Sequence, residues 1–171
     1  MTWEIRARRY VVGVSGSLGS LAALHQAVGE ARHHGIELLM ILAWEPPGGD
    51  PACLRAPCPP LLADLRRKAE ERIWAARDAA FAGGPVPCGV TTARGPAGKV
   101  LVAAADRPGD VLVVGAGRRG KWNRLRPSVT RYCLAHATCP VLAVPPSPLQ
   151  RDLSVWRRRT TFRRPVPRFD R

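Results

Sequence analysis

Short apolar runs alternate along the chain with longer segments in which apolar residues recur every three or four positions. The runs have the length of buried strands, and the segments between them have the spacing of amphipathic helices. Strands are therefore predicted at residues 10–14, 37–44, 86–93, 111–114 and 141–144. Helices are predicted between them, ending near His34, Phe81 and Ala105, and a last helix follows Ser128. Residues 45–60, rich in proline and glycine, are predicted to form a loop without regular structure.

Residues with strong positional preferences mark the ends of these predicted helices. Ser20 is the expected N-cap of the first helix, and Gly35 suits the left-handed position just beyond its last turn. Pro96 is expected at the first position of the third helix, where a missing N–H has no consequence. Ser128 is the expected N-cap of the last helix.

The alternation of strands and helices predicts an α/β fold with a parallel sheet covered by helices on both faces. In such folds, ligands bind beyond the carboxyl ends of the strands, where the strand order reverses. A chain of 171 residues, 46% of them hydrophobic, is long enough for one such domain. We expect the domain to span residues 1–145. Residues 146–171 have few aliphatic side chains and are expected to form a disordered or loosely docked arginine-rich tail.

A glycine-rich basic loop follows the strand predicted at 111–114. Its glycines and arginines are Gly115, Gly117, Arg118, Arg119 and Gly120. Glycines let backbone N–H groups approach a ligand closely, and the N-terminus of the following helix favours negative charge. The loop is therefore a candidate site for a phosphate, such as that of a nucleotide, although the same glycines would also make a tight turn. Ser128 is open to two roles as well, because its hydroxyl can cap the helix or contact the phosphate.

These segments resemble the universal stress protein family. The family signature is glycine, two residues, glycine, nine residues and then Gly-Ser or Gly-Thr. Here nine residues separate Gly117 from Pro127 and Ser128, so proline replaces one glycine, and Gly115 stands one residue too close to Gly117. Residues 11–17, VVGVSGS, resemble the family's first strand and turn, with Ser15 where an aspartate usually stands. The resemblance extends over roughly Tyr10 to Pro145.

The resemblance implies a three-layer sandwich whose five-stranded parallel sheet has the order 3-2-1-4-5. It also implies an ATP site, with the adenine against Ala43 and the phosphates over the glycine-rich loop, Ser128 and Val129. The family's aspartate reaches the nucleoside, whereas Ser15 is shorter and neutral, so ATP binding is expected to be weak. Finally, the resemblance implies a homodimer through the last strand, whose apolar edge at 141–144 invites pairing.

The formal net charge of +14 has two explanations. Arginine, alanine, glycine and proline are abundant while lysine is scarce, which is the residue usage of a GC-rich genome. Alternatively, the arginines contact a polyanion. Residues 146–171 hold eight arginines and two aspartates, a charge of +6, which leaves +8 for residues 1–145. A nucleic-acid-associated protein that binds polyanions nonspecifically through its tail is therefore one alternative function.

We find no catalytic constellation in the sequence and expect no enzymatic activity. The four histidines are expected to be structural or solvent-exposed, and the five cysteines lack zinc-site spacing. No apolar run is long enough to span a bilayer, and the first residues do not form a signal peptide, so a cytoplasmic protein is expected. The leading hypothesis is a stress-response protein with a weak or altered nucleotide or phosphate cleft, acting through dimerisation and partners. An ATP-hydrolysing or adenylate-forming enzyme on the same scaffold is the other alternative.

Overall fold

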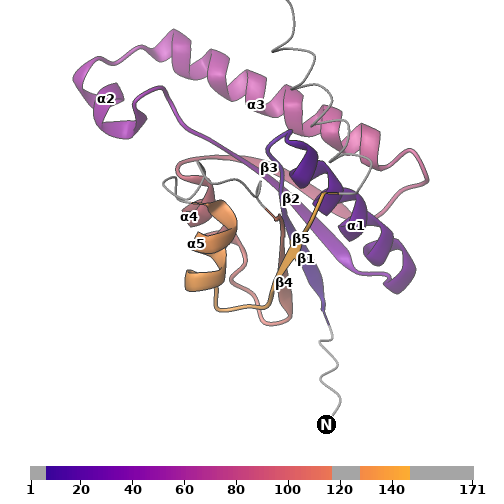
Figure 1. Cartoon of the computed structure of the whole chain (residues 1–171). Helices are drawn as coiled ribbons and strands as arrows, with labels where there is room; N and C mark the ends of the chain where they lie inside the picture. Colours follow the sequence, from indigo (N-terminus) through magenta and orange to yellow (C-terminus); the bar gives the residue numbers. More distant parts are fainter. Residues whose placement is uncertain (1–6, 117–127, 147–171) are drawn as a thin grey trace, which may run out of the picture.

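The computed structural model describes residues 7–116 and 128–146. At its centre lies a sheet of five parallel strands in the order β3-β2-β1-β4-β5 (Figure 1). The strands are β1 (Arg9–Gly13), β2 (Glu37–Trp44), β3 (Cys88–Arg94), β4 (Asp110–Gly115) and β5 (Val141–Val144). The predicted sheet and its order are confirmed, and every strand lies within two residues of its predicted bounds.

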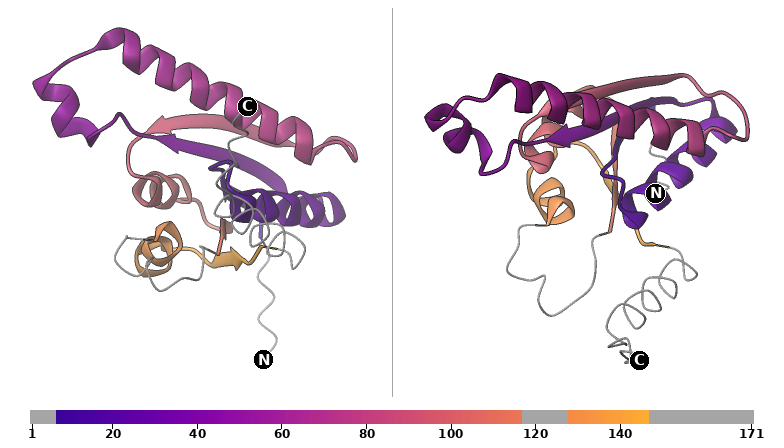
Figure 2. Two further views of the ribbon diagram at one scale, coloured as in Figure 1. Left: turned by 45° about the horizontal axis from the view of Figure 1, so that its top comes forward. Right: turned by 90° about the horizontal axis from the view of Figure 1, so that it is seen from above.

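Helices cover both faces of this sheet (Figures 1 and 2). Helices α1 (Leu18–His34) and α3 (Pro59–Ala80) pack on one face, and α4 (Ala97–Ala104) and α5 (Val129–His136) pack on the other. A short helix, α2 (Gly49–Arg55), lies beyond the carboxyl end of β2, in the connection to α3, and buries none of its residues. Among the helices of the described residues, none is both long and apolar enough to cross a membrane.

The central strands are apolar at every position because both of their faces are buried. Val12 and Val113 belong to the core under α1 and α3, whereas their neighbours Val11 and Leu112 belong to the core on the opposite face. All four side chains are fully buried. Successive side chains of a strand point to opposite faces, so a doubly covered strand shows a continuous apolar run and no alternation.

The prediction of Ser20 as the N-cap of α1 was wrong, because Ser17 holds that position. Ser17 has an extended backbone (φ −76°, ψ 153°), and its Oγ accepts a hydrogen bond from the N–H of Ser20 at 3.2 Å. Ser20 lies inside the first turn, where its own Oγ donates to the carbonyl of Ser17 at 2.9 Å. Both residues are serines with the same preference for the N-cap position, so this preference alone could not decide which of them caps the helix. At the other end of α1, Gly35 adopts the predicted left-handed conformation, with a φ of 65°.

One helix was not predicted, and the starts of two others differ from the prediction. Residues 45–60 were predicted to be a loop but contain α2, which leaves no apolar periodicity in the sequence because it is not buried. Helix α3 begins at Pro59, two residues earlier than predicted, since proline is tolerated in a first turn. Pro96 is the N-cap of α4 and not its first residue, because its ψ of 124° is extended.

A buried ion pair joins β1 to β4 at the amino end of the sheet. Nε and Nη2 of Arg9 donate to Oδ1 and Oδ2 of Asp110 at 2.9 and 2.6 Å, and the two side chains are only 8% and 1% exposed. Arg9 also donates to the carbonyl of Ala104, and the N–H of Arg107 donates to the Asp110 carboxylate. Burial raises the pKa of Asp110, but the hydrogen bonds from Arg9 and Arg107 outweigh burial and hold it below its usual value.

We expect Asp110→Ala to lower the free energy of unfolding by about 3–5 kcal/mol, because it leaves the buried Arg9 charge with only the exposed Asp106 carboxylate, 3.7 Å away. Replacing both residues, in Arg9→Met combined with Asp110→Leu, should cost much less. Urea denaturation at neutral pH measures the difference. Asp50→Ala, which breaks an exposed ion pair with Arg94, is the matched control. An equal loss in Asp110→Ala and in this control would contradict the expectation.

The same ion pair gives the stability a defined pH dependence. The folded-state pKa of Asp110 lies below its unfolded value, so its contribution is fully present above the unfolded pKa of about 3.9. The contribution is lost as the pH falls through the lower, folded-state pKa. The difference in stability between the unmodified protein and Asp110→Ala should therefore shrink only in acid.

Candidate functional site

The carboxyl ends of β2, β1 and β4 lie side by side, since these are neighbouring parallel strands (Figure 1). Three residues predicted to bind ligand follow or end these strands: Ala43 on β2, Ser15 just after β1 and Gly115 on β4. The connections leave in different directions here, because β1 leads to α1 on one face and β4 leads towards α5 on the other. This is the kind of edge at which α/β proteins bind ligands.

The turn from β1 to α1 is held together by hydroxyl groups. Oγ of Ser20 accepts a hydrogen bond from the N–H of Ser15 at 3.1 Å, and Oγ of Ser15 donates to Oγ of Ser17 at 3.0 Å. Gly16, between them, has a φ of 74°, which favours glycine. Ser15 and Ser17 are exposed, so the turn presents neutral hydroxyls to the solvent beyond β1.

The end of β4 lies directly against the first turn of α1. A Cβ atom on Gly115 would lie 2.5 Å from the carbonyl carbon and oxygen of Gly19 and 2.8 Å from the amide nitrogen of Ser20. Two backbones approach here without any side chain between them, which only glycine allows. Gly115 therefore has a packing role at the base of the loop that follows it.

The start of α5 is joined to the same strand end. Oγ1 of Thr130 donates a hydrogen bond to the carbonyl of Gly115 at 2.9 Å, linking the first turn of α5 to β4. Ser128 stands at the predicted N-cap position, but its side chain makes no capping hydrogen bond, and Val129 after it is exposed. Sequence analysis did not single out Thr130, since its only signal is a hydroxyl in a helical first turn.

The ends of β2 and β3 complete this edge of the sheet. Ala43 is half-buried, and Trp44 accepts a hydrogen bond at its carbonyl from the N–H of Gly95 at 2.9 Å. Nε and Nη2 of Arg94 donate to Oδ1 of Asp50 at 2.9 and 2.6 Å, which fastens α2 to the end of β3. The hydrogen bonds to Asp50 raise the pKa of Arg94, so its guanidinium stays charged.

The structure brings Ser15, Ala43, Gly115, Ser128 and Val129 to one edge of the sheet. The other residues predicted for the site, Gly117, Arg118, Arg119 and Gly120, lie outside the described residues, as does Pro127. The predicted tail lies outside them as well, apart from Pro146.

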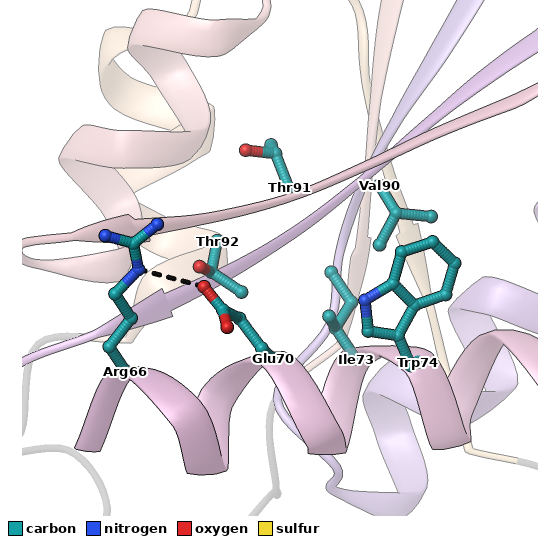
Figure 3. Close-up of a pocket in the computed structure, with 7 residues that line it drawn as sticks. All are labelled: Arg66, Glu70, Ile73, Trp74, Val90, Thr91 and Thr92. Carbon is teal, nitrogen blue, oxygen red and sulfur yellow. Dashed lines mark hydrogen bonds and ion pairs between the residues drawn. The ribbon is translucent and has the colours of Figure 1, made fainter. Parts of the chain in front are cut away.

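Two hollows of the described surface lie away from this edge. One, of about 210 Å³, opens between α3 and β3, where Arg66, Glu70 and Trp74 face Thr91 and Thr92 (Figure 3). Nε of Arg66 and Oε1 of Glu70 are 2.9 Å apart across its rim. The other, of about 350 Å³, lies by the amino ends of β4 and β5, next to Asp110. Neither hollow includes a residue predicted for the ligand site.

The described titratable groups form no metal or nucleophile centre. Within residues 7–116 and 128–146, no three His, Cys, Asp or Glu side chains are grouped to hold a metal ion. All four histidines are exposed, as predicted. Burial raises the pKa of the thiols of Cys88, Cys133 and Cys139, which keeps them protonated near neutral pH. At the turn after β1, the exposed polar side chains are the neutral hydroxyls of Ser15 and Ser17.

Comparison with known proteins identifies a family and solved structures that are similar to this chain. The profile of the Universal stress protein family matches residues 7–145 of the chain. The solved structure of a universal stress protein in complex with cAMP is 28% identical, with a TM-score of 0.64, and the match covers 83% of this chain and 99% of that one. Among curated proteins, none matches the chain.

Two further solved structures share the fold. UspA from Lactobacillus plantarum is 23% identical, with a TM-score of 0.61 and coverage of 81% of this chain and 98% of that one. A universal stress protein family protein from Arabidopsis thaliana with AMP bound is 17% identical, with a TM-score of 0.55 and coverage of 83% and 94%.

We expect Gly115→Ala to destabilise the protein by about 1–3 kcal/mol, because the new methyl group would overlap the backbone of Gly19. Gly29→Ala is the matched control, since it lies inside α1 and its new methyl group would meet nothing within 4 Å. The control should stabilise the protein by roughly 0.5–1 kcal/mol through helix propensity. Thermal unfolding of both variants distinguishes the effects, and a Gly115→Ala protein as stable as the unmodified one would refute the contact.

Proposed function

Because the chain belongs to the universal stress protein family, we propose that it binds a nucleotide or another phosphate-bearing ligand at the carboxyl edge of β2, β1 and β4. The observation that carries the proposal is the pairing of the β4 end with the start of α5. Ser128, the N-cap of α5, makes no side-chain capping hydrogen bond, and the hydrogen bond from Thr130 to the carbonyl of Gly115 fixes this helix start at the end of β4. A helix N-terminus at the carboxyl edge of the sheet suits an anionic group.

The relatives support a nucleotide as the ligand. The 28% identical universal stress protein is in complex with cAMP, and the family member from Arabidopsis thaliana has AMP bound. In the arrangement we propose here, the phosphates lie by Gly115, Ser128 and Val129, and the base lies near Ala43. The ribose then lies over the turn after β1, because β1 is the strand between β2 and β4.

Ser15 weakens this site for ATP. It offers one neutral hydroxyl, and that hydroxyl already donates to Oγ of Ser17. A charge-assisted hydrogen bond from an acid at this position would contribute roughly 1.5–3 kcal/mol, or about one to two decades in affinity. ATP binding should therefore be weak, sensitive to salt and poorly selective against other polyphosphates.

The proposed role is binding and not catalysis. The side chains of Ser15, Ala43 and Ser128 are neutral, and none titrates near neutral pH. We propose that the protein acts in the cytoplasm in a stress response, through its dimer and through partners. Nonspecific binding of nucleic acid by the arginine-rich tail and ATP hydrolysis on the same scaffold are the competing proposals, and salt-dependent DNA retention or nucleotide turnover would favour them.

Isothermal titration calorimetry with ATP at near-physiological salt should give a dissociation constant in the high-micromolar range or weaker. Ser15→Asp should tighten the binding of ATP more than that of tripolyphosphate, because only ATP has a nucleoside for the acid to reach. Tripolyphosphate titrated into both proteins is the control for general electrostatic effects. Submicromolar, adenine-selective binding by the unmodified chain would contradict the proposed weak site.

We also propose a homodimer through β5. Among the described strands, β5 pairs only with β4, so its other edge is available for pairing. Leu142, on this edge strand, is 41% exposed and offers apolar surface to a second chain. An exposed apolar edge favours association with a second strand.

Light scattering should give about twice the chain mass of 18.6 kDa, and Leu142→Asp should reduce it to a single chain mass. In a symmetric dimer through β5, each chain would bring one new aspartate into the interface, and two like charges there would disfavour pairing. Leu54→Asp, at an exposed leucine of α2, is the control and should leave the dimer intact. A monomeric unmodified protein would reject pairing through β5.

A further inference from the structure

One arginine of α3 lies over the turn that follows β1. The side chain of Arg72 crosses Gly16, with its Cδ 3.3 Å and its Cγ 3.8 Å from the position that a Cβ on Gly16 would take. Glycine at this position leaves room for the aliphatic part of the arginine. The guanidinium group begins one bond beyond Cδ, so its charge lies beside the turn formed by Ser15, Gly16 and Ser17.

Arg72 differs from the other basic residues of its helix. Each of the others has an acidic partner within 4 Å: Arg66 pairs with Glu70, Arg67 with Asp64 and Glu71, Lys68 with Asp64, and Arg77 with Asp78. Within the described residues, no ion pair involves Arg72, whose side chain is exposed. Its positive charge is therefore available to a ligand at the turn.

The turn itself brings no negative charge to meet this arginine. Ser15 and Ser17 are neutral, and the first turn of α1 contains no acidic residue. The group of a ligand best suited to this position is therefore an anion that can accept hydrogen bonds from a guanidinium and from hydroxyls. A phosphate meets both requirements, because arginine binds its oxygens through two parallel N–H groups.

We propose that Arg72 binds a phosphate carried on the ribose of a nucleotide. The inference rests on the proposed function, which puts the base near Ala43, the 5′-phosphate near Gly115 and the ribose over the turn between them. A ribose phosphate then meets Arg72 and the hydroxyls of the turn, while the 5′-phosphate remains at the start of α5. The ligand class is a nucleotide that carries one phosphate at the 5′ position and a second phosphate on another ribose oxygen.

The test compares two adenine nucleotides that each carry two phosphates, attached at different places. Adenosine 3′,5′-bisphosphate has one of them on the 3′-oxygen, whereas ADP has both on the 5′-oxygen. Calorimetry should show that the unmodified protein binds adenosine 3′,5′-bisphosphate about tenfold more tightly than ADP. Arg72→Gln should abolish this preference. Arg66→Gln removes the same charge from the same helix and should retain it.

Equal or tighter binding of ADP by the unmodified protein would overturn the inference without any variant. A preference that persists in Arg72→Gln, or that disappears equally in Arg66→Gln, would also overturn it, since the effect would not come from Arg72. If the unmodified protein binds neither nucleotide, the proposed function fails together with the inference. If it binds both with equal affinity, the proposed function stands and only the role of Arg72 is rejected.

Discussion

The arrangement of the carboxyl edge of the sheet depends on the contact between the end of β4 and the first turn of α1. No side chain separates the two backbones, because Gly115 meets Gly19 where any Cβ would overlap. The contact fixes where β4 ends relative to the turn after β1. Through the hydrogen bond from Thr130 to the carbonyl of Gly115, the same point also positions the start of α5. Three elements from distant parts of the sequence thus share one anchor.

The two ends of the sheet are stabilised by different physical means. At the amino end, β1 and β4 are joined by a buried charge pair whose hydrogen bonds hold Asp110 ionised. At the carboxyl end, the contacts around the turn after β1 are between backbones and hydroxyls, and the ion pair of Arg94 with Asp50 is exposed.

The sequence was sufficient to predict the parts of the fold that follow from burial. Continuous apolar runs identified the strands, since both faces of the sheet are covered, and the strand order came from the family resemblance. Local features were harder to predict. Ser17 and Ser20 have the same capping preference, and α2 buries nothing that could produce a periodic signal. Of the residues predicted for a ligand site, Ser15, Ala43, Gly115 and Ser128 do lie at one edge of the sheet. Thr130 was not singled out, because its contact is with a carbonyl fifteen residues away.

Arg72 illustrates why ligand specificity is difficult to predict from motifs. It lies fifty-six residues from Gly16 in the sequence, and in the helical pattern it looks like one of several solvent-exposed basic residues of α3. Only the packing of α3 beside α1 brings it over the turn, and only the pattern of ion pairs along the helix distinguishes it from its neighbours. The neutral turn and the nearby arginine are best understood together. With serines at positions 15 and 17, the turn contains no carboxylate, so the positive charge of Arg72 stays available for the anionic group that we propose.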